Sequence, residues 1–329
     1  IGLLLIGGVV MFLVLRKKPE AIEEKQERDS LFIVNQYANQ HYQHNLLHTD
    51  EGKSVGYSYF KERGYTQETI QKFQLGYSAE QYDRLYKSAT AKGHKTEYLQ
   101  KLGLSRQKNG RHYDFFRARV QFPLFNLSGK VIAFAGRTLK QGKKTPKYIN
   151  SPETEIYQKS KFLYGLYFAK KAIRQKDQCI LVEGYTDVIS LHQSGIENVV
   201  ASSGTSLTTQ QIHLLQRFTQ NVLILFDGDS AGIKAALRGV DMLLEQDVNV
   251  QIAVLPEGHD PDSFVTQEGK EALLAHLKTQ AQDFVLFKTQ LLLQEAQGNP
   301  VQKSALTKDI LQSIAKIPDP IKRTLQATT

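Results

Sequence analysis

Short apolar runs alternate with segments of helical period in the second half of the chain. The runs are rich in β-branched and aliphatic residues and cover residues 179–182, 198–201, 222–226 and 248–255. Between them, apolar residues recur at helical spacing, as Ile212, Leu215 and Phe218 do. Continuous apolar runs are typical of parallel strands that are buried on both faces. The pattern therefore predicts a right-handed βαβ series, an α/β fold with a parallel sheet flanked by helices.

The remaining pattern predicts a smaller part before this series and a helical part after it. Two apolar runs, at 120–122 and 131–134, flank a turn signal and predict a pair of strands. After Pro261 the period becomes helical, over 272–277, 284–296 and 304–315. We therefore expect a mixed α+β chain of four segments: an apolar segment and linker at 1–29, a basic subdomain at 30–176, the parallel-sheet domain at 177–265 and a helical subdomain at 266–329.

Carboxylates follow three of the predicted strands. They form three pairs: Glu183 with Asp187, Asp227 with Asp229, and Asp260 with Asp262. The carboxyl ends of parallel strands meet at one edge of a sheet, where open α/β folds place their ligands. So many like charges repel one another, and the usual neutraliser is a hard cation that prefers oxygen ligands. The sequence therefore predicts a divalent-metal site for Mg²⁺ or Mn²⁺ at this edge.

Each pair also has a purely structural interpretation. Asp187 could cap the helix that follows it, Asp229 could cap the next helix, and Asp-Pro-Asp is ordinary turn chemistry. Glu183 is harder to explain in this way, because the end of a buried strand is neither a cap nor a solvated face. Three pairs at the same edge favour a functional site.

The segment before the sheet domain is strongly basic. Between Lys140 and Lys176, lysine and arginine far outnumber the two acids, Glu153 and Glu155, and tyrosine and phenylalanine are interleaved with them. The whole chain has a net charge of +9 and a pI near 9.3, which favours an anionic partner. Bases that follow a phosphate backbone, with aromatic faces for unstacked bases, are typical of a single-strand groove. The alternative is a solvated face with several aromatic residues in the core.

The amino-terminal residues and the cysteine count add two expectations. Residues 1–15 are apolar and precede three basic residues, but fifteen residues fall short of the ~20 that span a bilayer. They are either the tail of a membrane helix or a foreign end. Residues 19–29 are either a linker or the charged start of a helix. The single cysteine, Cys179, lies in an apolar strand, so we expect no zinc site in this chain.

Several ordered motifs carry a resemblance to a known family. The segments Glu-Gly-Tyr-Thr-Asp at 183–187, Asp-Gly-Asp-Ser-Ala-Gly at 227–232 and Gly-His-Asp-Pro-Asp at 258–262 together resemble the TOPRIM domain of primases, topoisomerases and some nucleases. Upstream, the segments at 117–124, 129–137 and 146–154 resemble the basic half of the DnaG-type primase core. The resemblance covers roughly residue 30 to the end of the chain and narrows the TOPRIM class to bacterial primases.

The resemblance implies roles for named residues. Asp227, Asp229, Asp260 and Asp262 would hold the metal ions, and Glu183 would complete the site or assist proton removal, with Asp187 nearby. The residues that would hold template, primer or triphosphate are Arg117, Arg119, Arg137, Lys147 and Lys159, with Asn150 as a weaker candidate.

The resemblance also implies an activity and partners. The chain would be a DNA-dependent RNA polymerase that makes short RNA primers on single-stranded DNA from ribonucleoside triphosphates. It would act at the replication fork in the cytoplasm, with the replicative helicase and single-strand-binding protein as partners, although the family's zinc module and helicase-binding domain are not expected in this chain. Two rival functions remain, a TOPRIM-type metal-dependent nuclease and a catalytically silent nucleic-acid-binding module. A topoisomerase would need a separate strand-passage domain with a tyrosine nucleophile.

Overall fold

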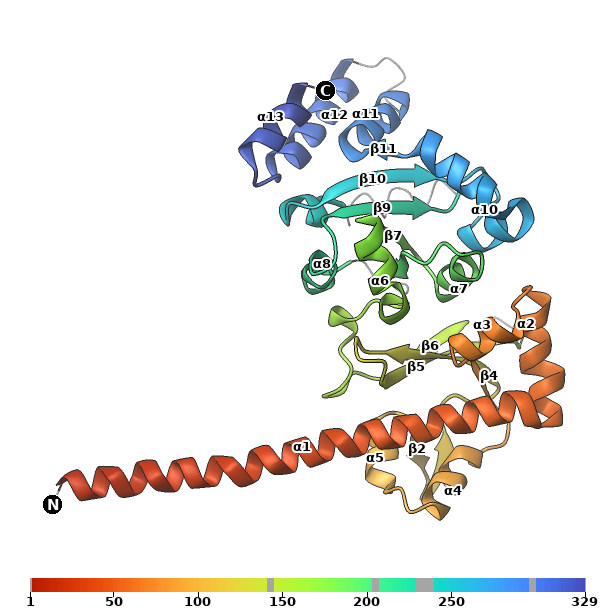
Figure 1. Cartoon of the computed structure of the whole chain (residues 1–329), viewed down its shortest axis with the longest axis vertical. Coiled ribbons are helices and arrows are strands. Elements are labelled where there is room, and N and C mark those ends of the chain that lie inside the picture. Colours follow the sequence, from red (N-terminus) through yellow and green to blue (C-terminus); the bar gives the residue numbers. More distant parts are fainter. Residues whose placement is uncertain (1, 141–144, 203–206, 229–239, 296–299, 329) are drawn as a thin grey trace. The chain divides into compact units, whose positions relative to one another are not determined.

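The computed structural model describes residues 2–140, 145–202, 207–228, 240–295 and 300–328. The chain forms two compact units (Figure 1). The first unit comprises Ile1–Tyr59 and Gln74–Gln158, and the second comprises Phe60–Phe73 and Lys159–Thr329. The second unit therefore begins earlier than the predicted boundary at 177, and it includes a short segment that the sequence had placed in the basic subdomain.

The first unit is built on a long helix and an antiparallel sheet. Helix α1 spans Gly2–His48, so residues 19–29 are helical and the linker interpretation is wrong. Among the residues that the structure describes, no helix is both long and apolar enough to cross a membrane. The buried residues of α1 recur at helical spacing and pack onto the sheet: Leu31, Val34, Ala38, Tyr42 and Leu46.

The antiparallel sheet has the strand order β1-β4-β5-β6. The central strands, β4 (Arg119–Phe125) and β5 (Val131–Thr138), contain the two predicted apolar runs, whereas β1 (Gly76–Ser78) and β6 (Tyr148–Asn150) were not predicted. The first unit also contains a π-helical turn at Gly52–Tyr57, α4 (Arg84–Ala91) and α5 (Thr96–Lys101), and α2 (Ser58–Glu62) crosses the boundary between the units. A separate hairpin joins β2 (Ser105–Lys108) to β3 (Arg111–Asp114).

The second unit contains the predicted parallel sheet. Its strand order is β11-β10-β9-β7-β8, in which β7 to β10 are parallel and β11 is antiparallel. The four parallel strands are β7 (Cys179–Val182), β8 (Val199–Ala201), β9 (Asn221–Phe226) and β10 (Asn249–Val254). These bounds agree closely with the four apolar runs, which confirms the α/β prediction. The two-residue edge strand β11 (Gln282–Asp283) was not predicted.

Helices connect the parallel strands and complete the unit. They are α3 (Gln67–Lys72), α6 (Leu166–Lys176), α7 (Tyr185–Gln193), α8 (Thr209–Gln216) and α10 (Pro261–Gln280), with a 3₁₀ turn at Lys159–Lys161. The carboxy-terminal helices α11 (Phe284–Glu295), α12 (Pro300–Ala315) and α13 (Pro320–Thr328) follow β11. The helical period predicted after Pro261 is therefore confirmed.

Candidate active site

Carboxylates lie at the carboxyl ends of three neighbouring parallel strands. Glu183 directly follows β7, Asp227 directly follows β9, and Asp260 lies between β10 and α10. The strands are aligned at this edge, because Phe226 pairs with Val254 in the last register position of β9 and β10. The edge that the sequence predicted as a site therefore exists.

Two loops at this edge meet through their backbones. The amide of Gly228 donates a hydrogen bond of 2.9 Å to the carbonyl of His259, which joins the loop after β9 to the loop after β10. A Cβ at position 228 would lie 2.1 Å from the carbonyl oxygen of Pro256, so only glycine fits this close approach. The glycine between the two aspartates of Asp-Gly-Asp thus holds Asp227 next to the loop that carries Asp260.

Asp187 caps a helix, which is one of the two interpretations that the sequence allowed. It lies in the first turn of α7, is buried, and accepts a hydrogen bond of 2.9 Å from the amide of Gly184. Burial, together with the charges of Asp260, Asp227 and Asp262, raises the pKa of Asp187 to about 7 against the opposing effect of the Gly184 amide. Asp187 is therefore a helix-capping residue that also belongs to a cluster of mutually repelling carboxylates.

The Asp-Pro-Asp segment divides into two different environments. Asp260 is exposed and caps α10, where its side chain accepts a hydrogen bond of 2.7 Å from the amide of Ser263. Asp262 is buried, pairs with the guanidinium of Arg63 and accepts a hydrogen bond from the hydroxyl of Ser190. Sequence reasoning missed Arg63, because nothing local links it to a residue 199 positions away.

The remaining acidic candidates need one correction. Glu183 is exposed, so the argument that it ends a strand away from solvent is wrong. Asp229 lies outside the described residues. Among the described residues, no three acidic, histidine or cysteine side chains are placed to hold one metal ion. The donors that do gather here are carboxylates, which fit a hard divalent cation.

Arg119 is a structural residue of the first unit. It is buried, and its guanidinium donates hydrogen bonds to the carbonyls of Gly136 (3.0 Å), Pro146 (3.0 Å) and Lys147 (3.2 Å). Burial lowers the pKa of Arg119 from its ordinary value. These contacts fix the backbone around Lys147, whose own side chain is exposed.

Arg137 and Asn150, two other candidates of this unit, are partly exposed. Arg137 is half-buried, donates a hydrogen bond to the hydroxyl of Tyr59, and lies 4.9 Å and 5.7 Å from the ring centres of Tyr59 and Tyr148. Asn150, on β6, pairs with Ala135 one pleat away from Arg137 and is partly exposed.

Arg117 and Lys159 are the two further basic candidates. Arg117 is exposed in the turn before β4, with its guanidinium 5.1 Å from the ring centre of Tyr82. Lys159 belongs to the second unit, where its carbonyl accepts a hydrogen bond of 3.2 Å from Gln211. The structure therefore places Arg137, Lys147 and Asn150 on adjoining strands and loops, and it does not bring Lys159 into that unit.

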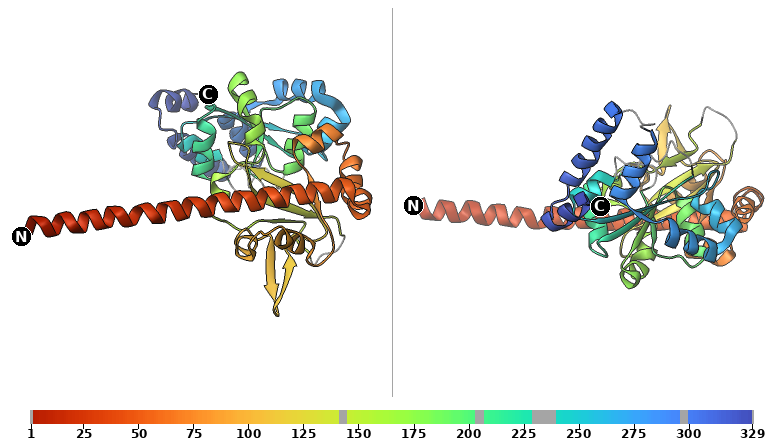
Figure 2. Two further views of the ribbon diagram at one scale, coloured as in Figure 1. Left: turned by 60° about the horizontal axis from the view of Figure 1, so that its bottom comes forward. Right: turned by 90° about the horizontal axis from the view of Figure 1, so that it is seen from above.

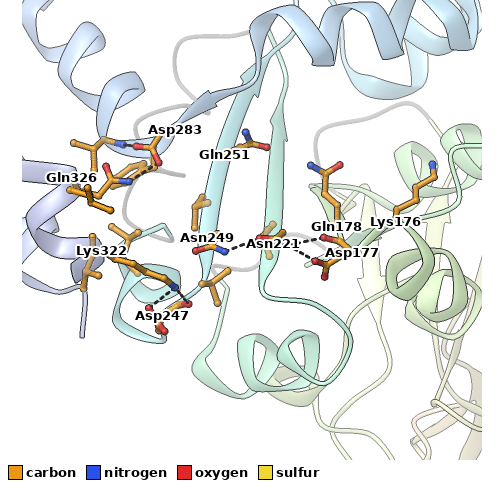
Figure 3. Close-up of a pocket in the computed structure, with 18 residues that line it drawn as sticks. Lys176, Asp177, Gln178, Asn221, Asp247, Asn249, Gln251, Asp283, Lys322 and Gln326 are labelled. Carbon is orange, nitrogen blue, oxygen red and sulfur yellow. Dashed lines mark hydrogen bonds and ion pairs between the residues drawn. The ribbon is translucent and has the colours of Figure 1, made fainter. Parts of the chain in front are cut away.

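A cavity of about 560 Å³ lies at the opposite edge of the parallel sheet, where β7, β9 and β10 begin (Figure 3). Its polar groups bond to one another: Asn221 to Asp177, Asn249 to Asn221, Lys322 to Asp247, and Gln326 to Asp283. None of the candidate site residues lines it. This cavity is therefore a polar seam between the sheet and α13, separate from the carboxylate edge.

Comparisons with known proteins agree with this geometry. A Toprim-like family model matches residues 180–265, so the second unit contains an α/β domain of the Toprim class. The model of the DNA primase catalytic core, N-terminal domain, matches residues 41–170. The chain belongs to the family of bacterial DnaG-type primases and corresponds to their catalytic core.

Individual relatives and solved structures are similar over most of the chain. The DNA primase of Halalkalibacterium halodurans is 35% identical over 306 residues, which is 92% of this chain and 51% of that protein. The chain spans about half the length of the curated relatives it matches. A DNA primase domain from Pseudomonas aeruginosa superposes with a TM-score of 0.82 at 37% identity, covering 90% of this chain and 93% of that one. A DnaG primase catalytic domain bound to single-stranded DNA gives a TM-score of 0.81 at 34% identity, covering 92% and 98%.

Proposed function

We propose that the chain is the catalytic core of a primase, a DNA-dependent RNA polymerase that makes short RNA primers on single-stranded DNA. The observation that supports this most is the convergence of Asp227, Asp260 and buried Asp187 at the carboxyl edge of a Toprim sheet. The accompanying basic unit matches the primase core, which distinguishes the chain from other Toprim proteins.

A divalent cation, Mg²⁺ in the first instance and Mn²⁺ as the alternative, is part of this proposal. Asp227, Asp229 and Asp260 would hold it, with Glu183 exposed at the same edge and Asp187 behind them. When bound, such a cation lowers the pKa of a primer 3′ hydroxyl and neutralises charge on the departing pyrophosphate. Asp262 is the weakest ligand candidate, because Arg63 and Ser190 already bind its carboxylate.

The residues of the chain would contribute positioning and electrostatics. Asp187 would add its negative charge to the charges of Asp227 and Asp260 at the metal site. The hydrogen bond from the Gly184 amide holds the Asp187 side chain in place. The Arg63–Asp262 pair would hold the start of α10, and with it the capping residue Asp260, in a fixed orientation. Arg63 and Asp262 would have positioning roles, because the charge of each is already neutralised by the other.

Template binding is assigned to the first unit. Arg137 and Lys147 would contact the phosphate backbone, and the rings of Tyr59 and Tyr148 beside Arg137 offer faces for bases. Arg117 and Asn150 would extend this surface, and Lys159 would contact the triphosphate or the primer. One similar catalytic domain was solved with single-stranded DNA, and the Mycobacterium tuberculosis RNA polymerase domain was solved with double-stranded DNA. Action at a replication fork with a helicase and single-strand-binding protein is part of the same proposal.

A template-dependent ribonucleotide incorporation assay tests the proposal. The wild-type chain should extend an RNA primer on single-stranded DNA in the presence of Mg²⁺ and should fail in its absence. Degradation of end-labelled DNA without incorporation would replace the polymerase with a nuclease. DNA binding without either reaction would identify a silent binding module.

A further inference from the structure

The β2–β3 hairpin presents three cations on one face. Its register pairs Arg106 with Tyr113 and Lys108 with Arg111, and cross-strand partners lie on the same side of the ribbon. Because side chains alternate along a strand, these four residues share one face, which we call the cationic face. Arg106, Lys108 and Arg111 are all exposed.

The opposite face of the hairpin is anchored to α4. Asp114 is buried, and its carboxylate accepts hydrogen bonds from the amides of Leu85 (2.7 Å) and Tyr86 (3.0 Å) at the start of that helix. The ring of His112 stacks on Tyr86 with centres 4.3 Å apart. At the tip, Asn109 and Gly110 both have positive φ, the conformation of a tight two-residue turn. The hairpin is therefore held rigidly, and it projects from the first unit (Figure 2).

The cationic face has an arrangement that burial and packing do not explain. Lys108 and Arg111 lie directly opposite each other, and like charges in that position destabilise a hairpin. Some other lysines of the same unit have acidic partners, such as Lys87 with Asp83 (3.0 Å) and Lys101 with Glu27 (2.6 Å). Within the part of the chain that the structure describes, the three hairpin cations have no carboxylate within 4.0 Å.

Aromatic rings border these cations. Arg106 lies 4.0 Å from the ring centre of Phe115, and Tyr113 lies 5.6 Å from Tyr82, a ring that is 43% exposed. The guanidinium of Arg117 lies 5.1 Å from the ring centre of the same Tyr82. Uncompensated cations next to exposed rings are the composition that follows a nucleic-acid backbone, whereas a surface for acidic proteins has no need of the rings.

We propose that the cationic face of the β2–β3 hairpin is a second contact for the phosphate backbone of the nucleic acid, in addition to the Arg137 and Lys147 surface. The polyanion offsets the repulsion between Lys108 and Arg111, and the contact is independent of base sequence. The inference extends the proposed function, because it adds a holding point for template or product outside the reacting centre. Single-stranded template and primer–template duplex share the chemistry that this face would recognise.

The test compares charge-removing and charge-keeping variants of the 329-residue chain. Binding of a labelled single strand and of a primer–template duplex is measured by fluorescence anisotropy over a series of salt concentrations. Lys108→Gln with Arg111→Gln should weaken binding and reduce the slope of log affinity against log salt by about 1.4 on a single strand or about 1.8 on a duplex. Lys108→Arg with Arg111→Lys, which keeps both charges, should bind like wild type.

A matched control removes two charges elsewhere in the same unit. Lys53→Gln with Lys92→Gln changes two exposed lysines outside the hairpin and should keep the wild-type slope. Loss on the single strand identifies the template as the ligand, and loss on the duplex identifies the product. Wild-type affinity and slope on both substrates would overturn the proposal in favour of a solvated or protein-binding face, as would an equal loss in the control pair. Primer extension at saturating DNA is measured in parallel, so absent extension by wild type rejects the polymerase function without affecting the binding comparison.

Discussion

Arg63 donates a hydrogen bond to the carboxylate of Asp262, and this pair joins residues 199 positions apart in the sequence. The side chains are 26% and 11% exposed, so the pair is shielded from solvent more than an ordinary surface ion pair. Ser190 binds the other oxygen of the same carboxylate. Asp262, the second aspartate of the Asp-Pro-Asp motif, therefore has a structural role.

Loss of Arg63 should destabilise the second unit. Arg63→Gln leaves the Asp262 carboxylate buried without its cation, which should lower the free energy of unfolding by about 1–3 kcal/mol. Arg63→Gln combined with Asp262→Asn should recover part of the loss. Urea denaturation measures both effects. Lys72→Gln, which breaks the exposed pair with Glu197, is the control and should cost less than about 1 kcal/mol; equal losses would mean that the Arg63 pair is not special.

The stability of the metal-free protein should depend on Asp187. Its pKa is raised from 3.8 to about 7 in the folded state, so between these values the folded chain binds more protons than the unfolded chain. This group therefore favours folding at low pH, and its contribution falls as pH rises through about 7. Relative to Asp187→Asn, the wild type should lose on the order of 3 kcal/mol between pH 4 and pH 8. Denaturation curves in a chelator, compared at the two pH values, would refute this if both proteins changed equally.

The carboxylates in front of Asp187 should be essential for chemistry but not for folding. Asp227→Asn should reduce Mg²⁺-dependent incorporation by about a hundredfold or more, because the reaction depends on charge at this edge. Its unfolding free energy should be unchanged or higher, since one of several repelling anions is removed. Asp229→Asn should behave in the same way. Glu268→Gln, an exposed position on α10, serves as the control; full activity in both aspartate variants would remove the metal assignment.

Substitutions at Arg119 and Lys147 should have different effects, the first on stability and the second on DNA binding. Arg119→Lys loses part of a set of three hydrogen bonds to carbonyls and should cost about 2 kcal/mol of stability. Lys147→Gln should leave stability unchanged and raise the Kd for single-stranded DNA of any sequence. Thermal denaturation and oligonucleotide titration of both variants give the comparison. If the Lys147 variant kept the wild-type affinity for DNA, Lys147 would be a solvent-exposed residue that does not contact the nucleic acid.

Substitution of Lys159 should weaken the binding of nucleotides, whereas substitution of Lys147 should weaken the binding of DNA. If it contacts the triphosphate, Lys159→Gln should raise the KM for nucleotides with little change in the Kd for DNA. Steady-state incorporation at varied nucleotide concentration measures the first quantity, and anisotropy measures the second. A change in DNA affinity alone would move Lys159 to the template surface.

The sequence predicted the Toprim sheet well because its strands are buried on both faces. Cys179–Val182 and residues 222–226 of β9 are continuous apolar runs, so the pattern locates them without tertiary information. The β2–β3 hairpin had one local signal, Asn109-Gly110, but its strands carry Arg106, Lys108 and other polar residues that do not alternate with apolar ones.

Side-chain roles were less predictable than strands. The motif placed Arg119 among the nucleic-acid ligands, yet its partners are carbonyls 17 to 28 positions away that only the folded sheet brings together. The exposure of Glu183 likewise depends on what covers the strand end and not on the strand itself. Contacts that join distant segments, such as those of Arg63, leave no periodic trace in the sequence.

The division of the chain into units has a consequence during synthesis. Phe60–Phe73 belongs to the second unit but is translated before most of the first. Its aromatic residues pack against later ones, since Phe73 lies 5.4 Å from the ring of His192 and the Tyr65 hydroxyl donates to the carbonyl of Thr186. At roughly 5–20 residues per second, a ribosome needs several seconds or more to supply those partners. During that interval the nascent chain carries an apolar segment that cannot yet be buried in its own unit.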